Sequence, residues 1–183
     1  MALSEPIDSR RWSGMHERLD TAIAGAASRY LAQFVTRPFG VESRQWSKEL
    51  DELRLKREPN YTMPGVPLVY ALRYMARRVI SVVGAYGLLS SQSMPRTVLD
   101  VGSGSGATAL AFDLLHPASR VSVVGIEPSR EMRNLAESLS LRGLVSARYR
   151  QGSVADIIAN PVLVRACDLL VFSACFPYGF DRW

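Results

Sequence analysis

Cysteine and histidine are scarce in this sequence, with two of each among 183 residues. Cys167 and Cys175 lie eight positions apart with no histidine near them, which is not the spacing of a zinc site. We expect buried thiols of an intracellular protein and no disulfide framework. His16 and His116 are isolated in the sequence. The sequence therefore predicts no metal site, and it identifies no catalytic residue.

Long apolar segments are also lacking. No uncharged apolar stretch reaches the roughly 18 residues that a membrane-spanning helix needs, so we predict no contact with a membrane. The chain begins MALSEPIDSRRW, with early acids and no apolar signal core. A secretion signal is not expected, and the acids argue against a mitochondrial presequence. We predict a cytoplasmic protein, with the mitochondrial matrix as the alternative.

Lysine is almost absent, since Lys48 and Lys56 are the only two and every other basic residue is arginine. The net charge is +5, from 22 basic and 17 acidic residues. The local excess lies in residues 61–95, which contain three arginines and no acid. An excess of this size is compatible with an anionic partner but does not demonstrate one.

What the sequence does contain is a glycine-rich segment at residues 97–113, TVLDVGSGSGATALAFD. An apolar run surrounding Asp100 is followed by Gly102, Gly104 and Gly106, and then by a second apolar run. This order predicts a buried parallel strand, a tight turn and a helix. Glycine tolerates positive φ and lets the backbone approach a ligand closely. Amides at the start of the helix can then face an anionic or polar group.

Strands and helices alternate through the second half of the chain, which predicts a parallel sheet with crossover helices. The expected fold is α/β, a Rossmann-like doubly wound sheet of about four strands, with a helical extension over residues 1–65 and the main domain over 66–183. Further strands are predicted over 120–126, 146–149 and 168–174. Helices are predicted over 13–35, 43–57, 67–89, 107–115, 129–141 and 154–158.

The predicted helix over residues 67–89 has two contrasting faces. Its buried stripe is expected to comprise Leu68, Leu72, Met75, Val79, Val82 and Tyr86. The opposite face is expected to carry Tyr70, Arg73, Tyr74 and Arg77. Arginine interleaved with tyrosine can stack on RNA bases and neutralise phosphates, which is one interpretation of this face. The alternative is a solvated face whose long side chains cover apolar surface.

Polar residues follow three of the predicted strands, where ligands bind in open parallel sheets. They are the glycine loop, Glu127 after the second strand and Ser153 after the third. A carboxylate at the position of Glu127 can accept hydrogen bonds from two ribose hydroxyls. The alternatives are a glycine turn that only packs strand on helix, and an acid that only favours a helix start.

The segment Asp100–Gly106 resembles motif I of the class I S-adenosylmethionine-dependent methyltransferases, D-x-G-x-G-x-G. The dinucleotide pattern G-x-G-x-x-G is the rival, and a nicotinamide oxidoreductase is the corresponding alternative. The resemblance covers roughly residues 95–174. It implies S-adenosylmethionine as cofactor and methyl transfer as activity. The implied cofactor-binding residues are Asp100, Gly102, Ser103, Gly104, Gly106, Glu127, Pro128 and Ser153. Ser153 stands where the family often has aspartate, with Asp156 nearby.

A narrower resemblance is to the mitochondrial and bacterial small-ribosomal-subunit methyltransferase-like family. It rests on Asn60-Tyr61-Thr62 with Pro64, on Tyr70 and Arg77 before the glycine loop, and on Glu127-Pro128-Ser129 followed by Met132. It implies RNA of the small ribosomal subunit as partner, through Tyr70, Arg73, Tyr74 and Arg77. The family's metal-binding cysteine clusters have no counterpart here.

The class I fold usually has seven strands, and this sequence supplies four. We therefore expect an incomplete class I fold, with an exposed apolar sheet edge that favours self-association or a partner segment. The predicted function is S-adenosylmethionine-dependent methyl transfer, with RNA as an acceptor to be tested. The alternative is a non-catalytic ribosome-assembly or binding module that retains the fold.

Overall fold

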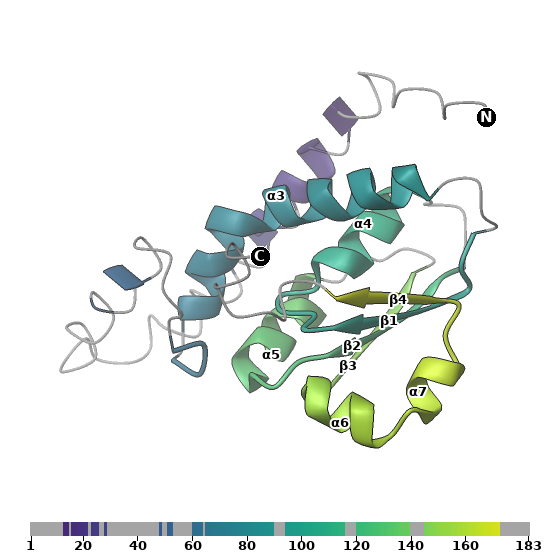
Figure 1. Ribbon diagram of the computed structural model, residues 1–183. Coiled ribbons are helices and arrows are strands. Elements are labelled where there is room, and N and C mark those ends of the chain that lie inside the picture. Colours follow the sequence, from purple (N-terminus) through teal and green to yellow (C-terminus); the bar gives the residue numbers. More distant parts are fainter. Residues whose placement is uncertain are drawn as a thin grey trace, which may run out of the picture.

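The computed structural model of the chain is shown in Figure 1. It describes residues 60–63, 65–89, 94–115, 120–139 and 145–172, together with scattered positions between 13 and 28 and residues 48, 51 and 52. Most of the predicted extension over 1–65, with its two helices, lies outside the described residues. Cys175 and the aromatic tail after residue 172 lie outside them as well.

Four parallel strands form the sheet, in the order β3-β2-β1-β4. Their bounds are β1 Thr97–Val101, β2 Ser122–Ile126, β3 Ser146–Arg150 and β4 Leu169–Phe172. The chain steps from β1 to β2 to β3 in one direction and then returns to the other side of β1 to form β4. This reversal makes the sheet doubly wound and confirms the predicted α/β class, with every predicted strand present.

The direction of each step decides which face a helix covers (Figure 1). Helices α4 (Ala107–Leu115) and α5 (Arg130–Leu139) cover one face, and α3 (Val66–Leu88) packs over them. Helices α6 (Val154–Ala159) and α7 (Val162–Arg165) cover the opposite face, because the connection that reverses direction must cross the sheet there. The sequence did not predict α7, which is a single turn.

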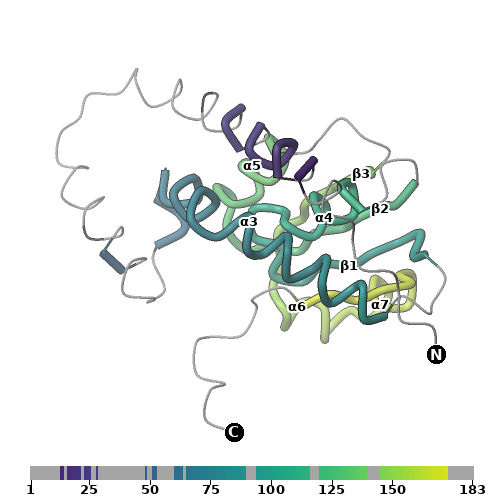
Figure 2. The backbone as a smooth tube through the Cα atoms, turned by 90° about the horizontal axis from the view of Figure 1, so that it is seen from above, coloured from purple at the N-terminus to yellow at the C-terminus, as the bar shows by residue number. Residues whose placement is uncertain are grey.

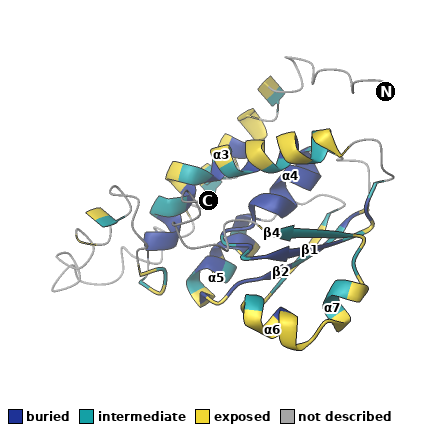
Figure 3. Cartoon of the chain, in the orientation of Figure 1, coloured by how far each residue is buried: buried dark blue, intermediate teal, exposed yellow. Residues whose placement is uncertain are grey.

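Helix α4 is enclosed between the sheet and α3, as Figures 2 and 3 show. Eight of its nine residues are buried, as expected for a helix that is apolar apart from Thr108 and Asp113. Side chains of β1 alternate between the two faces of the sheet. Val98 packs with Phe112 of α4, while Leu99 and Val101 pack with Ile157 of α6 on the other face.

The predicted buried stripe of α3 is wrong at Leu72, which is 55% exposed, while its neighbour Ala71 is buried. Val82 and Tyr86 are only partly buried, and Val83 is fully buried. The buried row runs 68, 71, 75, 79, 83, with one step of three residues and then steps of four, which keeps these side chains on one side of the helix.

The topology places one set of loops at the carboxyl end of the sheet. The loops after β1, β2 and β3 meet there, beside the point where the strand order reverses. Strand β4 forms the outer edge of the described sheet, and self-association along it stays a prediction. None of the described helices is long and apolar enough to cross a membrane.

Candidate functional site

The turn after β1 depends on glycine at alternate positions. Gly102, Gly104 and Gly106 have φ values of 73°, 52° and 87°, a region that side chains with a Cβ rarely adopt. The Gly102 and Ser103 amides both donate to the Ile126 carbonyl, at 2.8 and 3.1 Å. These two bonds join the turn to the end of β2, so the turn and the residue after Ile126 are held side by side.

That next residue, Glu127, holds the turn through its carboxylate. Its Oε2 accepts the Gly104 amide at 3.0 Å, and its Oε1 accepts the Ser129 amide at 2.9 Å. Burial raises the pKa of Glu127, while the hydrogen bonds from Ser129 and Gly104, and the charge of Arg133, act in the opposite direction. The side chain of Arg133 donates to the Glu127 carbonyl at 2.6 Å. Glu127 is therefore a buried carboxylate in a fixed orientation.

Ser129 connects this carboxylate to the segment before α3. Its hydroxyl accepts the Met132 amide at 3.2 Å, which caps the first turn of α5. The same hydroxyl donates to the Tyr61 carbonyl at 3.0 Å. The contact spans 68 positions of sequence and brings Tyr61 to the mouth of the site.

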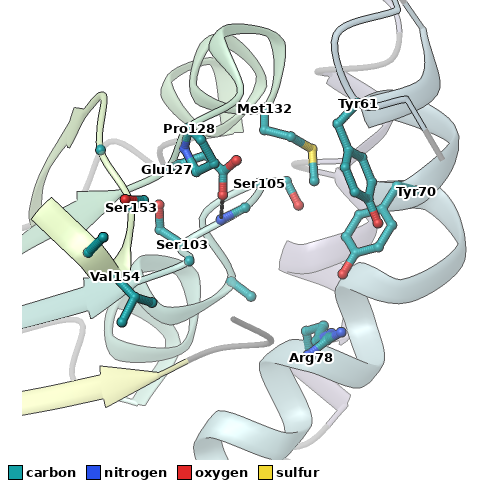
Figure 4. A pocket seen from close by; sticks show the side chains of 15 residues that line it. Tyr61, Tyr70, Arg78, Ser103, Ser105, Glu127, Pro128, Met132, Ser153 and Val154 are labelled. Carbon is teal, nitrogen blue, oxygen red and sulfur yellow. Dashed lines mark hydrogen bonds between the residues drawn. The ribbon is translucent and has the colours of Figure 1, made fainter. Parts of the chain in front are cut away.

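These elements enclose a cavity of about 390 Å³ (Figure 4), within the range of about 300–1,000 Å³ that is usual for small-molecule sites. One wall is formed by the glycine turn, Glu127 and Pro128, and the opposite wall by α3 and the segment before it. The described lining residues are Tyr61, Tyr70, Arg78, Gly102, Ser103, Gly104, Ser105, Ala107, Glu127, Pro128, Met132, Gly152, Ser153, Val154 and Ala155.

Six of the eight predicted site residues line this cavity: Gly102, Ser103, Gly104, Glu127, Pro128 and Ser153. The other two, Asp100 of β1 and Gly106 at the end of the turn, do not line it. A Cβ on Gly106 would lie 2.5 Å from the Tyr149 hydroxyl, so Gly106 leaves room for that ring. Burial, and then the charges of Asp100 and Glu137, raise the pKa of Tyr149. Asp100 therefore lies close enough to Tyr149 to act on it electrostatically, and it does not line the cavity.

Ser153 has a structural task in addition to lining the cavity. It is the N-cap of α6, and its amide and hydroxyl both donate to Asp156 Oδ2, at 2.6 and 2.7 Å. These bonds lower the pKa of Asp156, which forms a capping box with Ser153. The carboxylate of Asp156 is thus used within the helix cap, and it does not line the cavity.

Nine of the fifteen described lining residues were not among the predicted cofactor-binding residues, and Tyr61, Arg78 and Met132 are three of them. Tyr61 and Met132 occur in the motif stretches of the narrower resemblance, which was the available signal. Arg78 carries no signal of its own, because it directly follows Arg77 and either could face the cavity. A sequence pattern cannot distinguish neighbouring arginines when the orientation of the helix is unknown.

A row of tyrosine rings runs from the cavity along α3. Tyr61 and Tyr70 have ring centroids 5.5 Å apart in an edge-to-face arrangement, and Tyr70 and Tyr74 have centroids 5.1 Å apart. The Arg73 guanidinium lies 5.5 Å from the centroid of the Tyr74 ring. Arg77 is exposed on the same helix. The row therefore joins the cavity wall to basic side chains at the surface.

The described residues contain no group of three or more histidine, cysteine, aspartate or glutamate side chains that could hold a metal ion. Cys167 is half-buried and donates its thiol to the Val164 carbonyl at 3.1 Å. Burial raises the pKa of this thiol.

No protein-family model matches this sequence, and no curated protein matches it significantly. Among solved structures, the chain is similar to the plantazolicin methyltransferase BpumL in complex with a pentazolic desmethylPZN analog and SAH. The identity is 18% and the TM-score 0.34, over 76% of this chain and 44% of that one. The chain is also similar to the plantazolicin methyltransferase BamL in complex with a triazolic desmethylPZN analog and SAH. The identity is 17% and the TM-score 0.33, over 77% of this chain and 44% of that one. The chain spans less than half the length of these proteins. Similarity at this level does not transfer a function.

Proposed function

We propose that this chain binds S-adenosylmethionine in the cavity at the carboxyl end of the sheet and acts in methyl transfer. The observation that carries the proposal is the hydrogen bond between the Gly104 amide and the Glu127 carboxylate, at 3.0 Å. It places a bare backbone turn and an oriented acid on the same wall of the cavity. That pairing suits a ligand containing a ribose, at the position where open parallel sheets bind nucleosides.

The remaining hydrogen-bonding capacity of Glu127 fits a ribose. Each carboxylate oxygen accepts one backbone amide, and each has a second lone pair available. Two vicinal hydroxyls can donate to these lone pairs. Pro128, Met132 and Val154 provide apolar surface around the carboxylate, as expected for a site that covers the faces of a purine and a thioether.

The role of the chain in this reaction is to bind and orient. S-adenosylmethionine, when bound, supplies a methyl group on a positively charged sulfur. The glycine turn lets the ligand approach the backbone, and Glu127 fixes its ribose. Correct placement of donor and acceptor lowers the barrier of a transfer reaction substantially without a dedicated base. We assign no residue as a base.

Calorimetric titration with S-adenosylmethionine and S-adenosylhomocysteine tests the proposal. We expect the wild type to bind both, and Glu127→Gln to weaken binding by about tenfold or more, because hydrogen bonds to charged groups contribute about 1.5–3 kcal/mol. Gly104→Val should also weaken binding, since its φ of 52° strains a branched side chain. Glu137→Gln is the matched control, because Glu137 is exposed and does not line the cavity.

Two outcomes would contradict the proposal. The first is a folded wild type that binds neither ligand. The second is binding that survives Glu127→Gln unchanged. NADH is titrated in parallel, and tight binding of the dinucleotide alone would favour the oxidoreductase alternative.

We further propose RNA as the acceptor, bound along the tyrosine row of α3. The contact of Arg73 with Tyr74 and the exposed Arg77 support this assignment, because alternating aromatic and cationic groups suit unstacked bases and phosphates. Arg73→Gln with Arg77→Gln should weaken binding of a single-stranded RNA and flatten its salt dependence. Arg120→Gln is the control, since Arg120 is exposed and precedes β2 at the opposite end of the sheet. An unchanged salt dependence of RNA binding in the double variant would refute RNA binding here.

If the chain binds S-adenosylmethionine and RNA but transfers no methyl group, the non-catalytic binding module is favoured.

A further inference from the structure

The cavity has opposite charges on opposite walls. Among its described lining residues, Glu127 is the acid and Arg78 is the base. Glu127 follows β2, whereas Arg78 comes from α3 on the far side, as Figure 4 shows. A ligand that fills the cavity therefore meets a carboxylate at one end and a guanidinium at the other.

Arg78 differs from Arg133, which is also partly buried, and from the more exposed Arg18 in what its side chain contacts. Arg133 donates to the Glu127 and Pro128 carbonyls, and Arg18 pairs with Asp113 at 3.3 Å. Arg78 is partly buried, and no hydrogen bond or ion pair joins its guanidinium to another residue in the described part of the chain. A guanidinium that has lost part of its hydration favours an anionic partner with two acceptor oxygens.

The position of Arg78 also gives the direction of the ligand. Arg78 and Ala107 line a second cavity of about 380 Å³, which lies between α3 and β4. Arg78 therefore marks the β4 side of the first cavity, while Glu127 marks the β2 side. Because β1 lies between β2 and β4, a ligand that reaches both residues crosses the glycine turn at the end of β1.

We infer that Arg78 binds the carboxylate of the amino-acid part of the donor, and this inference rests on the proposed function. In S-adenosylmethionine the sulfonium sulfur joins the ribose on one side to the chain that ends in the carboxylate on the other. Glu127 accepts from the hydroxyls and repels the carboxylate, whereas Arg78 attracts the carboxylate. The two residues together fix one orientation of the ligand. An RNA phosphate is the competing anion, but the exposed Arg73 and Arg77 are better placed for it, since they do not line the cavity.

Two related ligands isolate this contact. S-adenosylhomocysteine contains the carboxylate, whereas 5′-methylthioadenosine has the same nucleoside and sulfur and lacks it. In calorimetric titrations, Arg78→Gln should lower the affinity for S-adenosylhomocysteine by about tenfold or more, as expected when a charge-assisted pair is lost. The affinity for 5′-methylthioadenosine should change by less than about twofold. Arg78→Lys keeps the charge without the bidentate geometry, so it should give a smaller loss confined to S-adenosylhomocysteine. Arg120→Gln, which is exposed and far from the cavity wall, is the control.

The outcomes separate this inference from the function on which it rests. If the wild type binds neither ligand, the proposed function fails and the inference fails with it. If the wild type binds both, and Arg78→Gln weakens both equally or neither, the proposed function stands and the inference is wrong. Thermal unfolding of each variant identifies a folding defect, and Arg78→Lys then decides the question if Arg78→Gln does not fold.

Discussion

Gly125 in β2 offers a quantitative test of how the site is built. Its register partners are Asp100 in β1 and Tyr149 in β3. A Cβ at this position would lie 2.5 Å from Tyr149 Cδ1, 2.8 Å from Tyr149 Cε1 and 2.7 Å from Ser103 Oγ. Gly125 thus leaves space for an aromatic ring on its neighbour and for a side chain of the glycine turn. We predict that Gly125→Ala destabilises the fold and disturbs the cavity.

The magnitude follows from two opposing effects. Overpacking costs about 1–3 kcal/mol. We expect a cost near the upper end of this range, because the strands on both sides of β2 hold its backbone in place. Replacing a strand glycine recovers about 0.5–1 kcal/mol of chain entropy. The cost of overpacking exceeds the entropic gain, so the free energy of unfolding should fall by about 2 kcal/mol. For a chain of this length, the midpoint of thermal unfolding should fall by about 4–8 °C.

Urea and thermal unfolding followed by circular dichroism measure this change. Gly84→Ala is the matched control, because a Cβ on Gly84 in α3 meets nothing within 4 Å, and a helical glycine replaced by alanine gains about 0.5–1 kcal/mol. The same Gly125→Ala change made in a Tyr149→Val background should cost less, since the ring is gone. The reasoning is refuted if Gly125→Ala is as stable as the wild type, or if its cost is the same in both backgrounds.

Three further predictions concern pH and packing. Because burial raises the pKa of Glu127, its carboxylate takes up a proton at a higher pH than usual. Affinity for S-adenosylhomocysteine, measured by calorimetry, should therefore fall as the pH falls through that range, and Glu127→Gln should show no such dependence. Asp168 Oδ2 accepts the two amides that lead into β1, at 2.8 and 2.9 Å, and these bonds lower its pKa. Asp168→Ala should lose stability at neutral pH in urea unfolding, and the difference should shrink as the pH falls through the folded pKa, since the wild type then loses the same stabilisation. Leu72→Gln should change the free energy of unfolding by no more than about 0.5 kcal/mol, whereas Met75→Ala should cost about 2–5 kcal/mol in the same assay.

The sequence predicted the sheet and its main ligand-binding loop from local features. Alternating apolar and glycine-rich segments predicted the four strands and α4 Ala107–Leu115, because strand burial and positive φ each select particular residue types. The position of Glu127 directly after a strand predicted its place at the carboxyl end of the sheet. The sequence missed α7, since a four-residue helix is too short for periodicity to detect.

Other features depended on contacts between distant segments. Glycine spacing alone did not distinguish Gly104, which contacts Glu127, from Gly106, which leaves room for Tyr149. The different roles of the two glycines arise because β3, which carries Tyr149, lies beside β2. The residues around each glycine do not specify which strands are neighbours in the sheet. The pairing of Ser153 with Asp156 likewise became definite only once the start of α6 was placed.

What the sequence by itself determined is the order of elements and the chemistry at each strand end, because backbone conformation and burial act over a few neighbouring residues. Only the tertiary structure decided the orientation of α3, which exposes Leu72 and turns Arg78, one position after Arg77, to the cavity. A helix periodicity fixes the angles between its side chains but not the direction in which the set points. That direction is set by packing against α4 and α5, through contacts with residues far along the chain.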